Sequence, residues 1–197
     1  MVNRCSGWRR SAVSAAIALL LTTFGGLWIT GYALSRPARA WLGAPPSDLA
    51  AETVRIPLEG GSLVIGWLAR GIKGQGAVLL LHPLRANRGS MVERARFLRR
   101  AGYTVLLIDL PSHGESEGAR ITFGARESEG TRAALAYLRR VAPGERVGAI
   151  GASLGGASLL LGTRGPAANG ADAVVLESVY PTIGEAVADR LRIRLGP

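Results

Sequence analysis

The sequence predicts an α/β fold: a mostly parallel sheet with helices on both faces, preceded by one transmembrane helix. From residue 53 onward, short aliphatic runs typical of buried strands alternate with segments of helical periodicity. Such alternation indicates parallel strands joined by helices. Turns containing glycine or proline separate these segments. Ahead of residue 36 lies one uncharged apolar stretch, long enough for a membrane helix.

The first 40 residues are predicted to form a membrane anchor. No charged residue lies between Arg10 and Arg36, and residues 12–34 are a mostly apolar run of 23. As a helix this run is about 35 Å long, enough to cross a hydrocarbon core of about 30 Å. Residues 12–34 therefore make the membrane a predicted partner of this protein.

Charge indicates the orientation of the anchor. Arg4, Arg9 and Arg10 precede the apolar run. This favours a cytoplasmic N-terminus and a single-pass protein whose domain is extracytoplasmic. The alternative is a secreted protein. Ala38-Arg39-Ala40 resembles the small-x-small site of a signal peptide, so cleavage near Ala40 stays open.

Residues 41–52 are predicted as a linker because they contain Pro45-Pro46, and residues 53–197 as one globular domain. Residues 77–81 form a continuous aliphatic run, which indicates a strand covered on both faces. The other predicted strands are residues 53–58 and 62–69, which form a hairpin, and residues 103–110, 146–150 and 173–176. Helices are predicted near residues 91–98, 127–141, 154–161 and 183–195.

Composition excludes several classes of function. The formal net charge is +10, and Lys73 is the only lysine among 24 cationic residues. The arginines are spread along the chain without interleaved aromatic residues, so no nucleic-acid surface is predicted. Cys5 is the only cysteine, and His82 and His113 are the only histidines. We therefore predict no intramolecular disulfide, no metal site and no cofactor.

The candidate nucleophile is Ser153, at the centre of Gly151-Ala152-Ser153-Leu154-Gly155. The five residues lie between a predicted strand and a predicted helix. This context is typical of a nucleophile elbow, a sharp turn that lifts a serine hydroxyl out of the end of a sheet. Because the serine backbone is strained in such a turn, Gly151 and Gly155 are needed as neighbours without side chains.

Three further segments match a known pattern in the correct order. Residues 81–88 contain a His followed two positions later by a candidate oxyanion-hole residue; residues 101–109 end in a strand and an Asp; residues 110–116 contain His-Gly-Glu-Ser. With the elbow, these segments resemble the front part of the alpha/beta-hydrolase family. Pro83 stands where the family usually has Gly, and Pro111-Ser112 replaces its Arg-Gly.

The resemblance implies a serine hydrolase that acts on a small ester, amide or peptide. Ser153 would be the nucleophile. The backbone N–H groups of Leu84 and Leu154 would form the oxyanion hole, which stabilises the negative charge that develops during attack. Glu177 ends the strand after the elbow, where some family members keep their acidic residue.

His82, His113 and Asp109 are interpreted as structural residues of their loops. Both histidines precede Ser153, whereas the family order is Ser, then Asp or Glu, then His. A serine hydroxyl without a base is a weak nucleophile. We therefore expect residues 53–197 to be a partial hydrolase domain, an inactive fragment that lacks the family's C-terminal strands with their Asp and His.

Two alternatives stay open. The chain could be a catalytically dead, membrane-anchored binding or scaffold module with a hydrolase-like fold. It could also be complemented by another chain that supplies the remaining strands and the histidine. A reading frame that continues beyond residue 197 and encodes Asp and His would favour the hypothesis of an inactive hydrolase fragment over both alternatives. In a complete sheet, the aliphatic strand at residues 173–176 suits an interior position.

Overall fold

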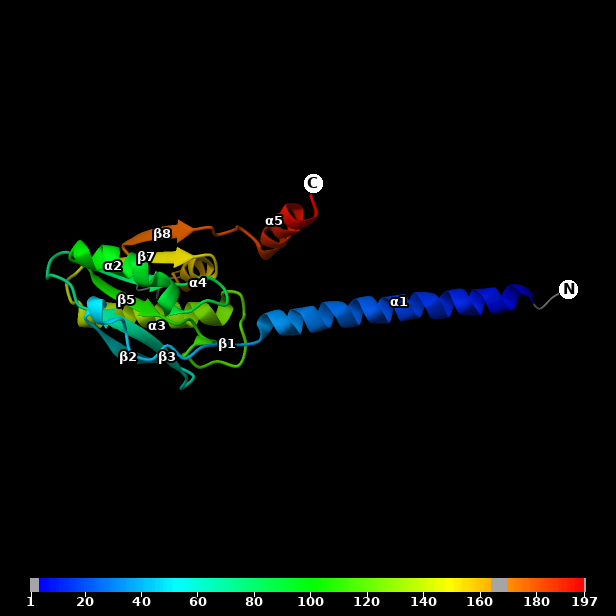
Figure 1. Ribbon diagram of the computed structural model, residues 1–197, viewed down its shortest axis with the longest axis horizontal. Helices are drawn as coiled ribbons and strands as arrows, with labels where there is room; N and C mark the ends of the chain where they lie inside the picture. Colours follow the sequence, from blue (N-terminus) through cyan, green and yellow to red (C-terminus); the bar gives the residue numbers. More distant parts are fainter. Residues whose placement is uncertain (1–3, 164–169, 197) are drawn as a thin grey trace. The chain divides into compact units, whose positions relative to one another are not determined.

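The computed structural model describes residues 4–163 and 170–196. The chain divides into two compact units, Met1–Arg36 and Pro37–Pro197 (Figure 1). The first unit is one continuous helix, α1 (Arg4–Ser35). Its segment Ser11–Ser35 contains an 18-residue window with a mean hydropathy of 1.9 and is long and apolar enough to cross a membrane, a property that signal sequences share.

The threonine hydroxyls of α1 are satisfied within the helix itself. Thr23 Oγ1 donates to the carbonyl of Leu19 at 2.8 Å, and Thr30 Oγ1 donates to that of Gly26 at 2.8 Å. Such bonds to the preceding turn lower the cost of placing hydroxyls in apolar surroundings. The threonines are therefore compatible with a helix that would lie in lipid.

The second unit is built on a six-stranded sheet of order β2-β3-β5-β4-β7-β8. Its strands are β2 (Ala51–Pro57), β3 (Leu63–Ala69), β4 (Ala77–Leu81), β5 (Thr104–Ile108), β7 (Val147–Ala152) and β8 (Ala173–Glu177). β3 is antiparallel to β2 and β5, whereas β5, β4, β7 and β8 are mutually parallel. The predicted α/β fold with a mostly parallel sheet is confirmed.

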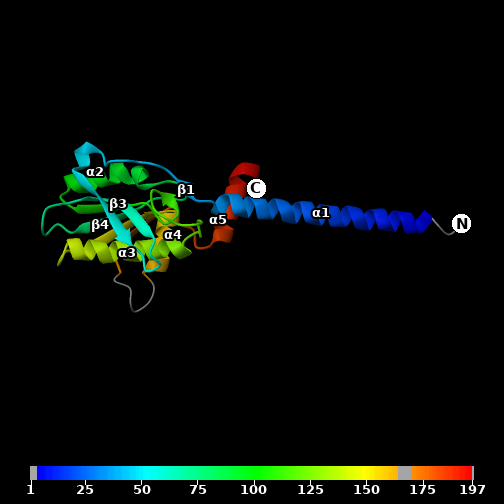
Figure 2. The same ribbon diagram turned by 90° about the horizontal axis from the view of Figure 1, so that it is seen from below.

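Helices cover both faces of this sheet (Figure 2). They are α2 (Val92–Arg100) on one face, and α3 (Ala125–Val141) and α4 (Leu154–Gly162) on the other. Successive side chains of β4 point to opposite faces. Leu79 and Leu81 pack in the cluster that includes α3 and α4, and Val78 and Leu80 pack in the cluster that includes α2. A strand covered on both sides in this way requires the aliphatic run seen in the sequence.

Residues 37–43, which we call the stem, are hydrogen-bonded to the loop that follows β5. Strand β1 (Ala38–Arg39) pairs in parallel with β6 (His113–Gly114). The N–H of Ala38 donates to Ser112 O at 2.9 Å, and that of Ala40 donates to Gly114 O at 3.1 Å. Beyond the stem, the 3-10 helix η1 (Ser47–Leu49) buries Leu49. The predicted linker, residues 41–52, thus includes ordered structure and the start of β2.

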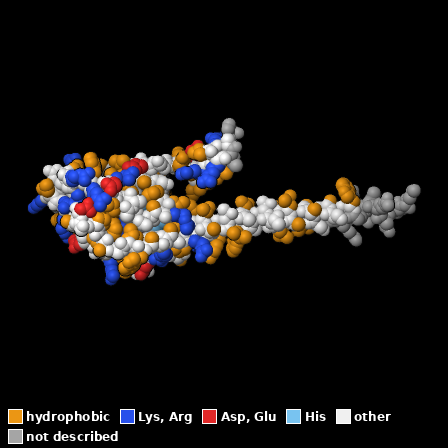
Figure 3. All heavy atoms as spheres, in the orientation of Figure 1, with side chains coloured by type: hydrophobic (Ala, Val, Ile, Leu, Met, Phe, Trp, Pro, Cys, Tyr) orange, Lys and Arg blue, Asp and Glu red, His pale blue; other side chains and the backbone are white. Residues whose placement is uncertain are grey.

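The last described elements are far more exposed than the centre of the sheet. Among the described strands β8 pairs with β7 alone. Val174, Val175 and Leu176 are 43%, 51% and 40% exposed. The helix α5 (Ile183–Leu195) carries exposed apolar and arginine side chains next to one another (Figure 3). The strand expected to suit an interior position is therefore an edge strand here.

Candidate active site

Ser153 occupies a strained turn between β7 and α4. Its φ is 48° and its ψ is −109°, a region that residues with a Cβ rarely adopt and that costs about 1–3 kcal/mol. Two backbone hydrogen bonds hold it there. The N–H of Ser153 donates to Glu177 O at 2.8 Å, and its carbonyl accepts from the N–H of Ala157 at 2.9 Å. Strain that the surroundings maintain in this way is typical of functional positions.

The glycines around Ser153 allow three chain segments to approach closely. A Cβ on Gly151 would lie 2.6 Å from Gly156 N, and a Cβ on Gly155 would lie 2.4 Å from Leu81 O at the end of β4. Sequence reasoning singled out Gly151 and Gly155 but missed Gly156, where a Cβ would lie 2.2 Å from Val179 Cγ2. The two adjacent glycines Gly155-Gly156 in the sequence could have indicated this further close approach to Val179.

The two candidate oxyanion donors come from neighbouring strand ends. Leu154 is the first residue of α4, so its N–H lies in the first turn, where N–H groups have no partner within the helix. Leu84 lies in the loop after β4, and β4 pairs with β7 in the register Leu81 to Gly151. The loop of Leu84 and the turn of Ser153 therefore leave the sheet side by side at its carboxyl edge.

His82 is fixed by the backbone at both ring nitrogens. Its Nδ1–H donates to Pro83 O at 2.8 Å, and its Nε2 accepts the N–H of Leu110 at 3.0 Å. Burial lowers the pKa of His82 to about 3. The imidazole is therefore neutral at pH 7, and its only lone pair on nitrogen is already used. His82 is a structural residue of its loop, as the sequence interpretation had it.

His113 is also buried and tied to its own loop. Its Nδ1–H donates to Pro111 O at 3.0 Å, and its ring lies 5.1 Å from that of His82. Burial lowers the pKa of His113 below its ordinary value. Its Nε2 is buried with no hydrogen-bond partner within residues 4–163 and 170–196. Nothing in this arrangement joins His113 to the hydroxyl of Ser153.

Asp109 belongs to a buried ion-pair network. Its carboxylate accepts hydrogen bonds from the Arg88 guanidinium, from the N–H of Arg88 at 2.7 Å and from the N–H of Glu115 at 2.8 Å. Arg88 also binds Glu115 and lies 4.4 Å from the centre of the Trp67 ring. Although burial opposes it, hydrogen bonds from Arg88 and from the N–H groups of Leu42 and Gly43 lower the pKa of Glu115. Asp109 is thus structural.

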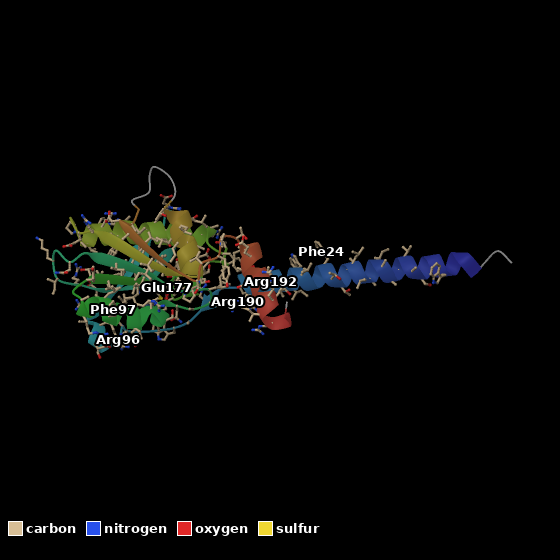
Figure 4. The ribbon with its side chains drawn as sticks, turned by 90° about the horizontal axis from the view of Figure 1, so that it is seen from above. Phe24, Arg96, Phe97, Glu177, Arg190 and Arg192 are labelled. Atoms are coloured by element: carbon tan, nitrogen blue, oxygen red, sulfur yellow. The ribbon has the colours of Figure 1, made fainter. Side chains whose placement is uncertain are left out.

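Glu177 ends β8 next to Ser153, but its carboxylate faces α2 (Figure 4). Both of its oxygens are bound by Arg94, with Arg94 Nε 3.1 Å from Oε1. This hydrogen bonding raises the pKa of Arg94. The residue suggested as the acid therefore pairs with a guanidinium in this structure. Arg94 was not found from the sequence because it lies 83 residues from Glu177 along the chain.

Within the described ranges, no three His, Cys, Asp or Glu side chains come together in a way that could hold a metal ion.

A family model described as the alpha/beta hydrolase family matches residues 78–197. The matched range begins in β4 and includes the loop of Leu84, the elbow and β8. This chain belongs to the alpha/beta hydrolase family. Among curated proteins, none matches the sequence of this chain.

Solved structures of similar fold include an esterase from Pyrococcus furiosus, with a TM-score of 0.70 and 24% identity. The match covers 82% of this chain and 66% of the esterase. An alpha/beta hydrolase from Novosphingobium aromaticivorans has a TM-score of 0.56 and 27% identity, over 72% of this chain and 49% of that one. A serine hydrolase without a lid from Xanthomonas campestris has a TM-score of 0.51 and 19% identity, over 73% and 78% of the two chains. The chain thus spans just under two thirds of the Pyrococcus esterase.

Proposed function

We propose that this alpha/beta hydrolase is a membrane-anchored serine hydrolase that cleaves acyl esters through Ser153. The observation that carries the proposal is the backbone of Ser153. A non-glycine residue with a φ of 48° stands between β7 and α4, next to an uncapped helix start. A strained serine at a strand-to-helix turn is the arrangement that exposes a nucleophile. Amide or peptide substrates would use the same chemistry, and the esterase fold of the Pyrococcus neighbour favours esters.

The proposed reaction consumes one water molecule for each ester. Ser153 Oγ attacks the carbonyl carbon while its proton passes to a base, and the N–H groups of Leu84 and Leu154 bind the oxygen that becomes negative. The base then protonates the leaving alcohol as the C–O bond breaks. Water attacks the resulting acyl-serine, releases the carboxylic acid and restores the hydroxyl of Ser153.

We propose that the base and the acid come from outside residues 1–197. His82 is bound at both nitrogens, and His113 is buried and tied to Pro111. The carboxylate of Glu177 is bound by Arg94, so Glu177 could act as the acid only if an imidazole replaced that guanidinium. A continuation of the same chain is the first source of base and acid, and a complementing chain is the second.

α1 supports the membrane part of the proposal. The segment Ser11–Ser35 passes the length and hydropathy criteria for a span, and the arginines before it favour a cytoplasmic N-terminus with the hydrolase unit outside. If signal peptidase cleaved near Ala40 instead, the enzyme would be secreted and would lose the hydrogen bonds of Ala38 to Ser112 and of Ala40 to Gly114.

The proposal is tested by ester hydrolysis in native membranes. Membranes that contain the protein should hydrolyse a short aryl ester faster than membranes with the Ser153→Ala variant. Purified residues 37–197 should be no faster than their own Ser153→Ala form, because both of their histidines are bound by backbone groups of their own loops. Native membranes whose activity is independent of Ser153 would contradict the proposal. Ser153-dependent turnover by residues 37–197 alone would show that the base lies within them.

A second candidate function is that of a catalytically dead, membrane-anchored scaffold. The observation that favours it is the same fixation of both histidines by backbone groups. Equal activity of native membranes with and without Ser153, together with a folded and monomeric hydrolase unit, would make the scaffold the better account.

A further inference from the structure

The stem is fixed to the hydrolase unit by both backbone and side-chain hydrogen bonds. Besides the β1–β6 pairing, Arg39 Nη2 donates to Gly118 O at 3.1 Å. The N–H groups of Leu42 and Gly43 donate to Glu115 Oε1 at 2.9 and 3.0 Å. Glu115 is in turn bound by Arg88, which is fully buried. The stem is therefore a fixed part of the domain's surface.

The stem lies at the carboxyl edge of the sheet, the same edge as Ser153. Its partner β6 belongs to the loop after β5, and Ser153 follows β7. β4 lies between β5 and β7, and all three strands are parallel. At a spacing of about 4.8 Å between strands, the carboxyl ends of β5 and β7 are about 10 Å apart. His82 and His113, whose rings are 5.1 Å apart, bridge part of this interval.

The stem also follows directly on the apolar helix. α1 ends at Ser35, and Ala38 is already paired with His113. Three residues can span at most about 11 Å when fully extended. Covalent connection alone therefore limits how far the attachment point at the carboxyl edge can move from the end of α1.

From these two constraints we infer that the catalytic edge is held at the membrane surface and that the substrates are acyl esters partitioned into the bilayer. The inference rests on the proposed function and the proposed anchor. An amphiphilic ester keeps its acyl chain among the lipid tails and its ester carbonyl at the level of the headgroups. Because the edge that carries Ser153 is attached to the end of α1 through three residues, the serine reaches such a carbonyl without extraction of the whole lipid. The guanidinium groups of Arg39 and Arg120 at this edge favour anionic surfaces.

The position of the edge can be measured without any activity. In a Cys5→Ser background, a fluorophore at Arg120→Cys reports on the carboxyl edge, and one at Lys73→Cys reports on the amino edge; both side chains are exposed. The five residues of β4 separate the two edges by about 17 Å. The full chain is reconstituted in phosphatidylcholine vesicles that contain nickel-chelating lipid. Quenching at residue 120 should be several-fold stronger than at residue 73. Equal quenching, or stronger quenching at residue 73, would overturn the inference.

A linker variant tests what this position does for the substrate. Twenty Gly/Ser residues inserted between Arg36 and Pro37 leave the stem and the site intact but lengthen the tether by about 25 Å on average. Quenching at residue 120 should fall to the value at residue 73. In native membranes, labelling of Ser153 by a long-chain phosphonate should fall about tenfold, because its effective concentration drops. Labelling by a short, water-soluble phosphonate should not change.

The two probes separate the possible failures. If the short probe labels Ser153 and the linker leaves long-chain labelling unchanged, the inference is wrong and the proposed function stands. If neither probe labels Ser153 with or without the linker, the proposed function itself fails, and the substrate class fails with it.

Discussion

The loop that follows β5 and the segment formed by β8 and α5 are opposites in packing, although both belong to the same compact unit of the chain. In the first region, Asp109 is fully buried and is bound to the equally buried Arg88 of the segment that follows β4. In the second, Val175 is 51% and Ile193 73% exposed. Ser153 belongs to the buried β7–α4 junction but donates its N–H to Glu177 of the exposed strand. The nucleophile thus depends on a well-packed region for its strain and on a poorly covered one for part of its support.

Breaking the buried ion pair should have the largest effect on stability. Arg88→Met leaves the carboxylate of Asp109 buried without its guanidinium, and loss of one partner of a buried pair costs about 3–5 kcal/mol. Urea unfolding of residues 37–197 measures this loss. The matched control is Arg70→Met, which breaks an exposed pair with Glu52 and should leave the midpoint almost unchanged. Similar midpoints for the two variants would show that the buried network does not set the stability of this region.

A methyl group at the elbow should have the next largest effect. In Gly155→Ala the new Cβ would lie 2.4 Å from Leu81 O, so β4 and α4 must move apart, at a cost of about 1–3 kcal/mol. The matched control is Gly60→Ala, because Gly60 has nothing within 4 Å of its ideal Cβ. Thermal unfolding compares the two. A Gly155→Ala protein as stable as Gly60→Ala would refute the close approach at the elbow.

Lowering the pH should decrease the free energy of unfolding through the buried imidazole of His82. The pKa of His82 falls from its ordinary value near 6.5 to about 3 on folding, so the unfolded chain binds the extra proton between these values. The contribution of neutral His82 to the free energy of unfolding is therefore complete above about pH 6.5. It falls by about 1.4 kcal/mol for each pH unit below that value. Denaturant unfolding at pH 7 and pH 5 measures the slope, which should be smaller in His82→Gln. Equal slopes in both proteins would contradict this account of His82.

The exposed strand β8 should affect the self-association of the protein more than its free energy of unfolding. Among the strands that the structure describes, β8 has a partner on one side only, and its exposed apolar side chains make that edge a template for pairing between molecules. Residues 37–197 should therefore self-associate and bind a hydrophobic dye. Val175→Lys should reduce both at little cost to unfolding, because Val175 is half exposed. Light scattering and dye fluorescence measure this. A monomeric parent with little dye binding would indicate that the edge is covered in solution.

The sequence predicted the central strands well because their signal is local. β4 begins and ends where predicted, and β7 and β8 within two residues, since an aliphatic run covered on both faces needs no knowledge of distant residues. The elbow was predicted for the same reason. Its constraint lies within five consecutive residues and one backbone conformation.

Contacts between residues distant in sequence could not be predicted. Leu42 and Glu115 are 73 residues apart and Arg94 and Glu177 are 83 apart, and neither pair leaves a periodic trace in the sequence. Hence the stem was expected to be part of an anchor and a linker, and Glu177 was considered as an acid without its guanidinium partner. Both features depend on the tertiary fold alone.

The nucleophilic role of Ser153 is tested most directly by covalent labelling in native membranes. A fluorophosphonate should add its phosphonyl group to Ser153, and fragmentation of the peptide should assign the added mass to Ser153. Ser158, five positions on and fully buried, provides an internal control that should remain unmodified. Membranes in which other serine hydrolases are labelled while Ser153 stays unmodified would contradict the account.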